Sequence, residues 1–434
     1  MKSLTMTARG RRTAFAGFGV LAAAALALTA CAPPNAAAPE PGDGSDGGSD
    51  TLTVGYISPT TGNFAVAGQE MVDGWNLYWE NNGGKAGDVT IKTIVEDDAG
   101  NPETSLTKAH KLVEQDKVDI IVGPLIANTA LAVAEYTSTV GIPNLHPVAA
   151  SDDLTQRNHN GLTVRTGSMG GSQANYPGGE WAATEGGYKT AVTLCADYAF
   201  GWESCAGFVQ GFTENGGELI KQIWFPNSTT DFSTYASQIQ AADADVVYVA
   251  TAGGAPGPNF LNAYLGLGLD QDKLLVNCCA ADQGTLRAMG DQILGLKSIS
   301  YWAEGLDSDA TREFVEVYKK FSDGKIPGAY VAGGYMTASL VASVLKEKGL
   351  VTGEDLVTAI AEYEFTDSIF GRVSWDDYNN MVGPVFIREV QKLDDGSLYN
   401  VPIATVEDVD QWLGRDPEKA MAQPTYSQDF QGLE

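Results

Sequence analysis

Short apolar runs and longer one-sided apolar patterns alternate along the chain from residue 52 to residue 391. Short runs bounded by turn-forming residues predict strands, and apolar positions repeated every three to four residues predict helices. The predicted strands cover residues 52–57, 89–95, 120–122, 142–145, 190–194, 219–225, 246–251, 274–277, 372–375 and 385–391. The predicted helices cover residues 66–80, 103–114, 131–141, 203–214, 232–241, 260–267, 311–321, 332–348 and 354–363. This alternation is typical of α/β folds with doubly wound parallel sheets.

Residues 119–155 contain a complete strand, helix and strand unit. The run Ile120–Val122 suits a strand buried on both faces of a parallel sheet, and Gly123-Pro124 ends it. Small or hydroxyl-bearing residues follow the two strands: Ala127, Asn128 and Thr129 after the first, and Ala149, Ala150 and Ser151 after the second. Ligands of open α/β sheets bind beyond the carboxyl ends of the strands, near unpaired N–H groups of helix N-termini. We therefore expect these two strand ends to form half of a pocket.

The chain without its first thirty residues is too long for one hydrophobic core. Its roughly 400 residues exceed the length at which single cores stop growing, and the strand and helix rhythm starts again after residue 167. We therefore predict two α/β lobes. The pattern weakens from residue 401, and we expect residues 416–434 to form an irregular tail.

The first thirty residues have the pattern of an export signal. Four basic residues precede an apolar run over residues 14–28, and Leu28-Thr29-Ala30-Cys31 closes it. This tetrapeptide resembles the lipobox of bacterial lipoproteins, whose cysteine becomes the lipidated first residue of the mature chain. The alternative is an ordinary signal peptide with an incidental cysteine, and Arg11-Arg12 is only a fragment of a twin-arginine signal. Residues 31–50 are dominated by Pro, Ala, Gly, Ser and Asp and are expected to form a disordered tether.

Acidic residues outnumber basic ones two to one. The chain has 27 Lys and Arg against 55 Asp and Glu, which gives a formal net charge of −28. Cleavage after residue 30 would remove four bases and no acid, and so move the charge from −28 to −32. Such a surface argues against nucleic acid or an anionic membrane as partner. No second long apolar run follows, so the lipid on Cys31 alone would hold the protein at the outer face of the cell membrane.

Short motifs recur in and after the predicted strands, from Leu52 to about Lys392. They are Thr61-Gly62 with Gly68 and Gly74, Glu96-Asp97-Asp98, Ile121-Val122-Gly123-Pro124, Pro147-Val148-Ala149-Ala150-Ser151 with Leu154-Thr155, Arg165-Thr166, Phe200-Gly201, Asp231-Phe232-Ser233 and Phe370-Gly371. In this order and spacing, the chain resembles the type I periplasmic binding proteins of the branched-chain amino-acid class. These proteins are the solute receptors of ABC importers.

The resemblance implies two doubly wound parallel-sheet lobes joined by three crossovers, near residues 165–167, 302–304 and 363–367. The first lobe would comprise residues 52–166 and 303–366, and the second residues 167–302 and 367–400, followed by an extension over residues 401–434. A ligand would lie between the lobes, which close around it by a hinge motion. The resemblance also implies a monomer that delivers a small-molecule solute to an ABC permease, without a cofactor or a bound metal.

Relatives that bind amino acids hold the carboxylate with a serine and a threonine, cap the pocket with a tyrosine, and hold the ammonium with an acidic residue. By resemblance these positions fall on Ala127, Ala150, Phe200, and Cys279 or Ala280, so every polar group is missing. A buried ammonium without a carboxylate would be costly. Four polar residues stand nearby in the sequence and could restore the contacts after a small shift: Asn128, Thr129, Ser151 and Asp282.

Several aromatic residues also fall near the cleft by resemblance, with Val148 beside the second strand end. They are Phe64, Tyr198, Phe200, Trp202 and Tyr330. Each of them could instead serve ordinary core or hinge packing. Together they favour a ligand with a flat or apolar body. We therefore expect weak binding of leucine, isoleucine and valine and better binding of small organics with one polar end; a displaced amino-acid site is the alternative.

Four cysteines are left once Cys31 is lipidated: Cys195, Cys205, Cys278 and Cys279. An even number in an exported protein predicts two disulfides, for which three pairings are open. We favour Cys195–Cys205 together with a vicinal Cys278–Cys279 bridge. A zinc site would need better ligand spacing, and none of the three histidines is close to these cysteines in sequence.

The rival class is an exported hydrolase, and the sequence lacks its motifs. It contains neither G-x-S-x-G nor H-E-x-x-H, and the patterns around His110, His146 and His159 indicate a helix face, a strand end and a loop. His146 fits a structural or cleft-lining residue better than a catalytic base. A ligand sensor of the same fold, which signals to a membrane partner without transport, stays open as an alternative.

Overall fold

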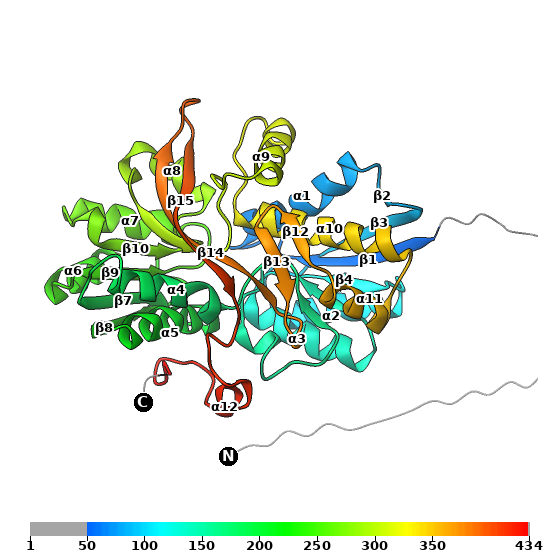
Figure 1. Cartoon of the computed structure of the whole chain (residues 1–434), viewed down its shortest axis with the longest axis horizontal. Helices are drawn as coiled ribbons and strands as arrows, with labels where there is room; N and C mark the ends of the chain where they lie inside the picture. Colours follow the sequence, from blue (N-terminus) through cyan, green and yellow to red (C-terminus); the bar gives the residue numbers. More distant parts are fainter. Residues whose placement is uncertain (1–49, 433–434) are drawn as a thin grey trace, which may run out of the picture. The chain divides into compact units, whose positions relative to one another are not determined.

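The computed structural model describes residues 50–432 of the 434-residue chain (Figure 1). The predicted signal peptide, the lipidation site Cys31 and residues 31–49 of the predicted tether lie outside the described residues. No helix within residues 50–432 is both long and apolar enough to cross a membrane.

Six strands form the first sheet, in the order β2-β3-β1-β4-β5-β6. All neighbouring pairs are parallel except β2 with β3. The strands are β1 (Thr51–Ser58), β2 (Lys85–Ala86), β3 (Val89–Asp97), β4 (Ile120–Val122), β5 (Asn144–His146) and β6 (Thr163–Arg165). The strand order reverses between β1 and β4, and at such a switch point the carboxyl ends of a parallel sheet leave room for a ligand.

The second sheet repeats this arrangement and then adds antiparallel strands, in the order β12-β13-β14-β11-β10-β9-β7-β8. Strands β7 to β11 are parallel, and β14 runs antiparallel to both β11 and β15. The strands are β7 (Thr190–Ala196), β8 (Glu218–Phe225), β9 (Val246–Ala250), β10 (Leu274–Asn277), β11 (Lys297–Ser300), β12 (Phe365–Ser368), β13 (Gly371–Trp375), β14 (Met381–Lys392) and β15 (Leu398–Val409). The predicted α/β class with two doubly wound sheets is confirmed, and antiparallel strands extend the second sheet.

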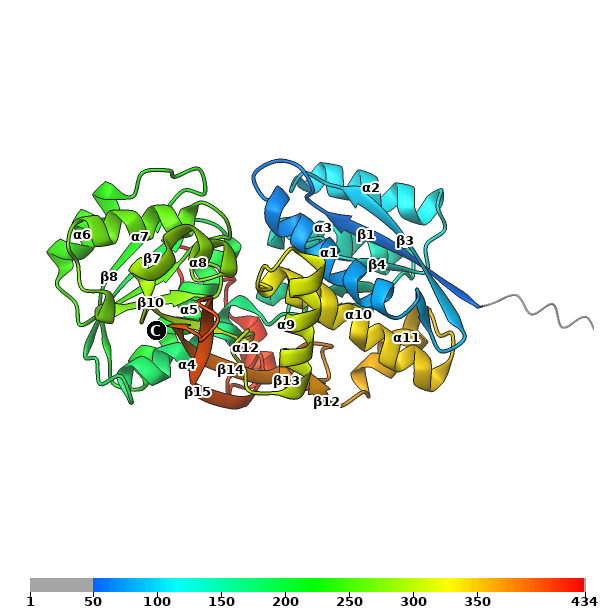
Figure 2. The same cartoon turned by 90° about the horizontal axis from the view of Figure 1, so that it is seen from above.

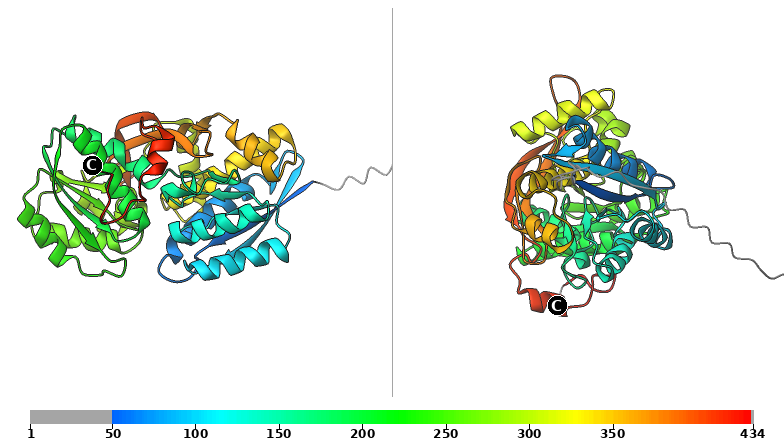
Figure 3. Two further views of the ribbon diagram at one scale, coloured as in Figure 1. Left: turned by 90° about the horizontal axis from the view of Figure 1, so that it is seen from below. Right: turned by 90° about the vertical axis from the view of Figure 1, so that its right-hand side faces the viewer.

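Helices cover both faces of each sheet (Figures 2 and 3). With the first sheet lie α1 (Ala65–Asn81), α2 (Pro102–Glu114), α3 (Ala127–Thr139), η1 (Asp152–Leu154), α9 (Asp309–Phe321), α10 (Ala329–Lys348) and α11 (Gly353–Ala361). With the second lie α4 (Gly171–Ala183), α5 (Ala199–Glu214), α6 (Ser233–Ala242), α7 (Pro256–Gly266), η2 (Gln271–Lys273), α8 (Gln283–Met289) and η3 (Gly290–Ile293). We call each sheet with its helices a lobe.

Alternation along β1 explains why helices pack on both faces of the first sheet. Val54 and Tyr56 pack in a core with Met71 and Trp75 of α1, whereas Ile57 packs in a separate core with residues of α2 and α3. Successive side chains of a strand point to opposite faces, so a strand with apolar side chains on both faces is covered by helices on both.

Glycines let α1 and α10 approach each other closely. A Cβ on Gly74 would lie 2.0 Å from the carbonyl oxygen of Val331, and one on Gly334 would lie 2.1 Å from that of Met71. Both distances are far below van der Waals contact, so a side chain at either position would push the helices apart. This contact holds α10, and with it Tyr330, against α1.

The C-terminal part is more ordered than the sequence pattern suggests. Strand β15 continues to Val409, so the extension predicted from residue 401 begins inside a strand of the second sheet. A six-residue helix, α12 (Pro417–Ala422), lies within the tail that we expected to be irregular (Figure 1). Asp416 caps it by accepting a hydrogen bond from the N–H of Lys419 at 3.0 Å. The predicted lobe boundaries stay predictions.

Arg165, fully buried at the end of β6, ties the chain segments that pass between the lobes. It donates to the carbonyl oxygens of Ala149 and Ser151 and to the side chain of Asn380, which precedes β14. Trp375 of β13 donates in turn to the carbonyl oxygen of Arg165 at 2.8 Å. The residues after β5 are therefore held by a buried cation next to the crossover.

Candidate ligand-binding site

A pocket lies between the lobes, at the carboxyl ends of strands from both sheets. It contains about 740 Å³ of space free of protein atoms, a volume that includes open solvent at its mouth. The first lobe contributes Phe64, Leu125, Ile126, Ala127, Val148, Ala150, Ala329 and Tyr330. The second contributes Met169, Gly170, Ala174, Asn175, Tyr198, Phe200, Ala252, Gly253, Cys278, Cys279, Ile299 and Tyr301. Most of this wall is apolar or aromatic, as is usual for sites that bind small organic molecules.

The first-lobe wall is built around the N-terminus of α3. Its cap residue, Ile126, has extended backbone and an apolar side chain, and no acidic residue lies in the first helical turn. The first N–H groups of a helix have no partner within the helix. Because these groups carry partial positive charge, the start of α3 at Ala127 favours an anionic group in the pocket.

The second-lobe wall has the same feature at α5. The helix starts after Tyr198, which caps it without a side-chain hydrogen bond, and its first turn also lacks an acidic residue. Tyr198 and Phe200 lie with their ring centroids 6.1 Å apart. Burial raises the pKa of the Tyr198 phenol well above its usual value, so the hydroxyl stays neutral.

Asn175 is the one side-chain amide among the lining residues, and its hydrogen bonds within the second lobe engage both ends of the amide. Its Nδ2 donates to the carbonyl oxygen of Gly171 at 2.8 Å, and its Oδ1 accepts from the hydroxyl of Tyr248 at 2.7 Å. These bonds fix the side chain in one orientation within α4.

The side chain of Tyr330, a residue of the first lobe, contacts the second lobe. Its hydroxyl lies 3.5 Å from the Sγ atom of Cys279, and a Cβ built on Gly253 would lie 2.0 Å from its Oη atom. Any side chain at position 253 would therefore strike the phenol. Glycine here allows the loop after β9 to approach α10.

Other contacts join the lobes beside the pocket. The Asp282 carboxylate accepts from the N–H of Ala329 at 2.9 Å, and Arg287 of α8 lies 3.5 Å from Glu70 of α1. Burial, followed by the nearby Asp282 carboxylate, raises the pKa of Glu70 to about 7. The two lobes are thus in contact through ionisable side chains that are only partly exposed to solvent.

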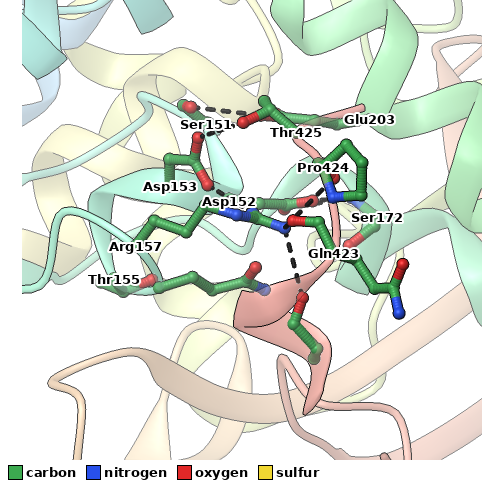
Figure 4. Close-up of polar contacts among 12 residues, drawn as sticks. Ser151, Asp152, Asp153, Thr155, Arg157, Ser172, Glu203, Gln423, Pro424 and Thr425 are labelled. Carbon is green, nitrogen blue, oxygen red and sulfur yellow. Dashed lines mark hydrogen bonds and ion pairs between the residues drawn. The ribbon is translucent and has the colours of Figure 1, made fainter. Parts of the chain in front are cut away.

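A second group of contacts lies near the start of α4 (Figure 4). The hydroxyl of Ser151 donates to Glu203 of α5 at 3.1 Å, and Asp152 accepts from the N–H of Ser172 at 3.2 Å. Burial raises the pKa of both carboxyls, to about 6 for Asp152, and the Asp152 carboxylate raises the pKa of Glu203 further. The structure therefore shows the lobes in contact at two places beside the pocket.

Eight of the residues that the sequence pointed to line this pocket. They are Phe64, Ala127, Val148, Ala150, Tyr198, Phe200, Cys279 and Tyr330. The polar side chains that we expected to bind the ligand at the two strand ends do not line the pocket. Asn128 is exposed on α3, Thr129 donates to the carbonyl oxygen of Ile126, and Ser151 is engaged by Glu203.

The other predicted residues have structural contacts elsewhere. The indole N–H of Trp202 donates to Asp197 at 3.0 Å, the carbonyl oxygen of Ala149 accepts from Arg165, and Ala280 packs in the core of the second lobe. Asp282 binds the backbone of Ala329 rather than lining the pocket. His146 is fully buried, and burial lowers its pKa to about 3, so it is a neutral structural residue.

Sequence reasoning missed the part of the wall formed by α4 and β11. Met169, Asn175, Ile299 and Tyr301 come from segments for which we predicted no helix or strand. The alternation of Ser298, Ile299 and Ser300 was an available signal for a strand, but α4 offers little. Cys278, adjacent to the predicted Cys279, also lines the pocket.

One of the two predicted disulfides is present. Cys195 and Cys205 are bonded, with a Cα–Cα distance of 6.3 Å. The vicinal bridge is wrong: Cys278 and Cys279 are free thiols whose Sγ atoms lie 3.5 Å apart, well beyond the roughly 2.05 Å of a sulfur–sulfur bond. Both side chains are half-buried in the turn after β10.

A family model described as periplasmic binding protein matches residues 51–397. The chain belongs to this family. A Leu/Ile/Val-binding protein homologue of Brucella melitensis is 28% identical over 364 residues, covering 82% of this chain and 92% of the relative. The solved neighbours have the type I periplasmic binding fold, as the resemblance implied.

Two solved structures of ABC transporter solute-binding proteins are similar to this periplasmic binding protein. One, from Rhodopseudomonas palustris BisB5, is in complex with 3,4-dihydroxybenzoic acid; it is 31% identical with a TM-score of 0.77 and covers 83% of this chain and 99% of its own. The other, from Rhodopseudomonas palustris HaA2, is in complex with p-hydroxybenzoic acid; it is 25% identical with a TM-score of 0.77 and covers 84% and 99%.

Proposed function

We propose that the chain is the extracytoplasmic solute-binding lipoprotein of an ABC importer, and that its pocket takes a small aromatic carboxylate for delivery to a permease. The composition of the pocket wall is the observation that supports this ligand class. Its 20 residues include no Asp, Glu, Lys, Arg or His. An α-ammonium enclosed there would have no carboxylate partner and would lose its hydration uncompensated.

The pocket wall suits both the ring and the carboxylate group of an aromatic carboxylate. Rings of Phe64, Tyr198, Phe200, Tyr301 and Tyr330 offer edge and face contacts to a flat body. The N-termini of α3 and α5 favour a carboxylate without a buried counter-ion. The benzoic acid derivatives bound by two similar proteins support this ligand class. The name of the Brucella relative favours branched-chain amino acids instead.

Calorimetric titration of the purified protein with 4-hydroxybenzoate and with leucine tests the ligand class. We expect micromolar binding of the benzoate, about −8 kcal/mol, and no measurable heat with leucine. Micromolar leucine binding together with no benzoate binding would overturn the proposal. Recovery of the benzoate unchanged is also expected, because we propose a receptor; a product formed at catalytic turnover would mean an enzyme.

A pair of charge variants tests the role of the α3 N-terminus. Ala127→Asp places a carboxylate in the pocket wall, whereas Asn128→Asp adds the same charge at the next, exposed position. We expect the first to weaken benzoate binding by about tenfold or more, since one buried like-charge contact exceeds 1.4 kcal/mol. The second should change it much less because solvent screens the charge.

A further inference from the structure

Cys278 and Cys279 place two thiols side by side in the pocket wall. They follow β10 directly, both line the pocket, and both are free. Their Sγ atoms are 3.5 Å apart. An aromatic carboxylate has no group that requires a pair of thiols for binding, so the proposed ligand does not explain why they lie in the pocket wall.

The distance between the two sulfurs fits one bridging atom. With bonds of about 2.3 Å to each sulfur, a separation of 3.5 Å corresponds to a sulfur–atom–sulfur angle of about 100°. That bent angle suits a pyramidal three-coordinate centre such as trivalent arsenic, and not the linear geometry of two-coordinate Cu(I). Within the described residues no three His, Cys, Asp or Glu side chains are grouped to hold a metal, so a closed tetrahedral zinc site is not available.

The surroundings of the thiols favour reaction with a soft electrophile. A hydrogen bond from Cys279 and the nearby Arg388 guanidinium lower the pKa of the Cys278 thiol, which makes it the better nucleophile of the pair. Tyr330 donates to Cys279. Tyr198, Phe200 and Tyr301 in the same wall would accept an aromatic ring attached to the electrophile.

We propose that the Cys278–Cys279 pair is a capture site for aromatic trivalent arsenicals, which occupy the same pocket as the organic solute. Both thiols attack the arsenic of an arylarsonous acid, ArAs(OH)₂. Two arsenic–oxygen bonds break, two arsenic–sulfur bonds form, and the two thiol protons leave with the hydroxyls as two water molecules. No atom changes its oxidation state, so no oxidant or reductant is consumed.

Intact mass spectrometry of the reduced full chain with phenylarsonous acid tests this capture. We expect one adduct per chain, equal in mass to the acid less two waters. Cys278→Ser and Cys279→Ser should each weaken binding by about a hundredfold, because the second arsenic–sulfur bond forms at high effective concentration. A thermal melt shows whether each variant is folded.

Competition and variant experiments distinguish capture in the pocket from reaction at a single exposed thiol. Phenylarsonous acid should compete with the benzoate, whereas inorganic arsenite, which lacks the ring, should bind more weakly than the aryl compound. Absence of an adduct with the reduced wild-type chain, or equal capture by a folded Cys278→Ser variant, would overturn the proposal. Failure of benzoate binding alone would count against the proposed function and leave arsenical capture standing.

Discussion

The guanidinium of Arg157 donates through Nη2 to the carbonyl oxygen of Gln423 at 2.8 Å (Figure 4). The same group reaches the carbonyl oxygens of Ala420 and Pro424, while Nη1 pairs with Asp153 at 2.7 Å. Arg157 lies just after η1 of the first lobe, so the C-terminal segment is tied to that lobe by a charged donor.

The same C-terminal segment also contacts the second lobe. Gln210 of α5 donates to the hydroxyl of Tyr426 at 3.1 Å and to the carbonyl oxygen of Gln431 at 2.9 Å. Arg415 pairs with Glu214 at 2.8 Å. Residues 415–431 therefore connect the two lobes by contacts that lie beyond the end of the family match at residue 397.

Replacing Arg157 by alanine should destabilise the protein. Loss of hydrogen bonds to a charged, half-buried donor costs about 2 kcal/mol, which lowers the melting temperature by roughly 2–3 °C in a chain of this length. Arg372→Ala is the matched control, because Arg372 is exposed and its ion pairs are 3.5 and 3.7 Å long. Equal melting temperatures for both variants in a thermal scan would show that the Arg157 contacts contribute no stability.

Ligand affinity should fall as the pH rises from about 5 to 8. Glu70 has a raised pKa of about 7 in this structure, where the lobes meet, so the state with the lobes in contact holds a proton that a solvated glutamate, with a pKa of 4.5, would release. Closure therefore takes up a proton between these two values, and raising the pH through 7 removes this contribution. A single group changes affinity by at most about tenfold per pH unit.

The groups around Glu70 determine how the pH profile is tested. Asp282 and Asp73 raise its pKa, whereas Arg287 and Lys325 lower it. Glu70→Gln should flatten the dependence of benzoate affinity on pH over this range, and Glu80→Gln, at an exposed position on the same helix, should leave it unchanged. A profile that keeps its slope in Glu70→Gln would assign the proton to another contact, such as Asp152 with Glu203.

Membrane attachment through Cys31 is tested by labelling with a fatty acid. Because the predicted lipid attaches to the Cys31 thiol, Cys31→Ala should abolish incorporation of labelled palmitate and release the protein from the membrane fraction. Cys278→Ala removes a different thiol and should keep both. Unchanged labelling of the Cys31→Ala variant would refute the lipoprotein assignment.

The sequence predicts the fold best where one short segment decides its own structure. Ile120–Val122 is apolar throughout and forms the buried strand β4, and the Asn101-Pro102-Glu103 run starts α2, with Asn101 capping it at 3.0 Å. Other elements depend on distant partners. Strand β15 carries Pro402 and two acidic residues near its end, yet it pairs with β14 along most of its length, which a local pattern does not show.

Helix α4 is the clearest case of structure decided by packing. It contains four residues of low helix propensity, Gly171, Pro177, Gly178 and Gly179. A Cβ on Gly179 would lie 2.0 Å from the carbonyl oxygen of Phe208 in α5, so the glycines serve the contact between the two helices. Local propensity argues against a helix here, and the contact with α5 offsets it.

The pocket could be predicted in position but not in its polar contacts. Both strand ends named from the sequence line it, through Ala127 and Ala150. The polar neighbour Asn128 does not, because α3 begins at Ala127, and successive helical residues point about 100° apart. A shift of one residue along α3 therefore moves the side chain that we expected to anchor the ligand from the pocket into the solvent.

Phe200 should contribute directly to the affinity for an aromatic ligand. It lies in the pocket wall beside Tyr198, where the amino-acid-binding relatives are expected to place a tyrosine. Phe200→Ala removes ring contacts worth about 1.4 kcal/mol and should weaken 4-hydroxybenzoate binding by about tenfold in calorimetry. Phe321→Ala makes the same change at a residue of α9 that is 42% exposed, and should leave the affinity unchanged. If Phe200→Ala binds the benzoate as tightly as the wild type does, the ligand does not lie against this ring, and the aromatic part of the proposed pocket would be wrong.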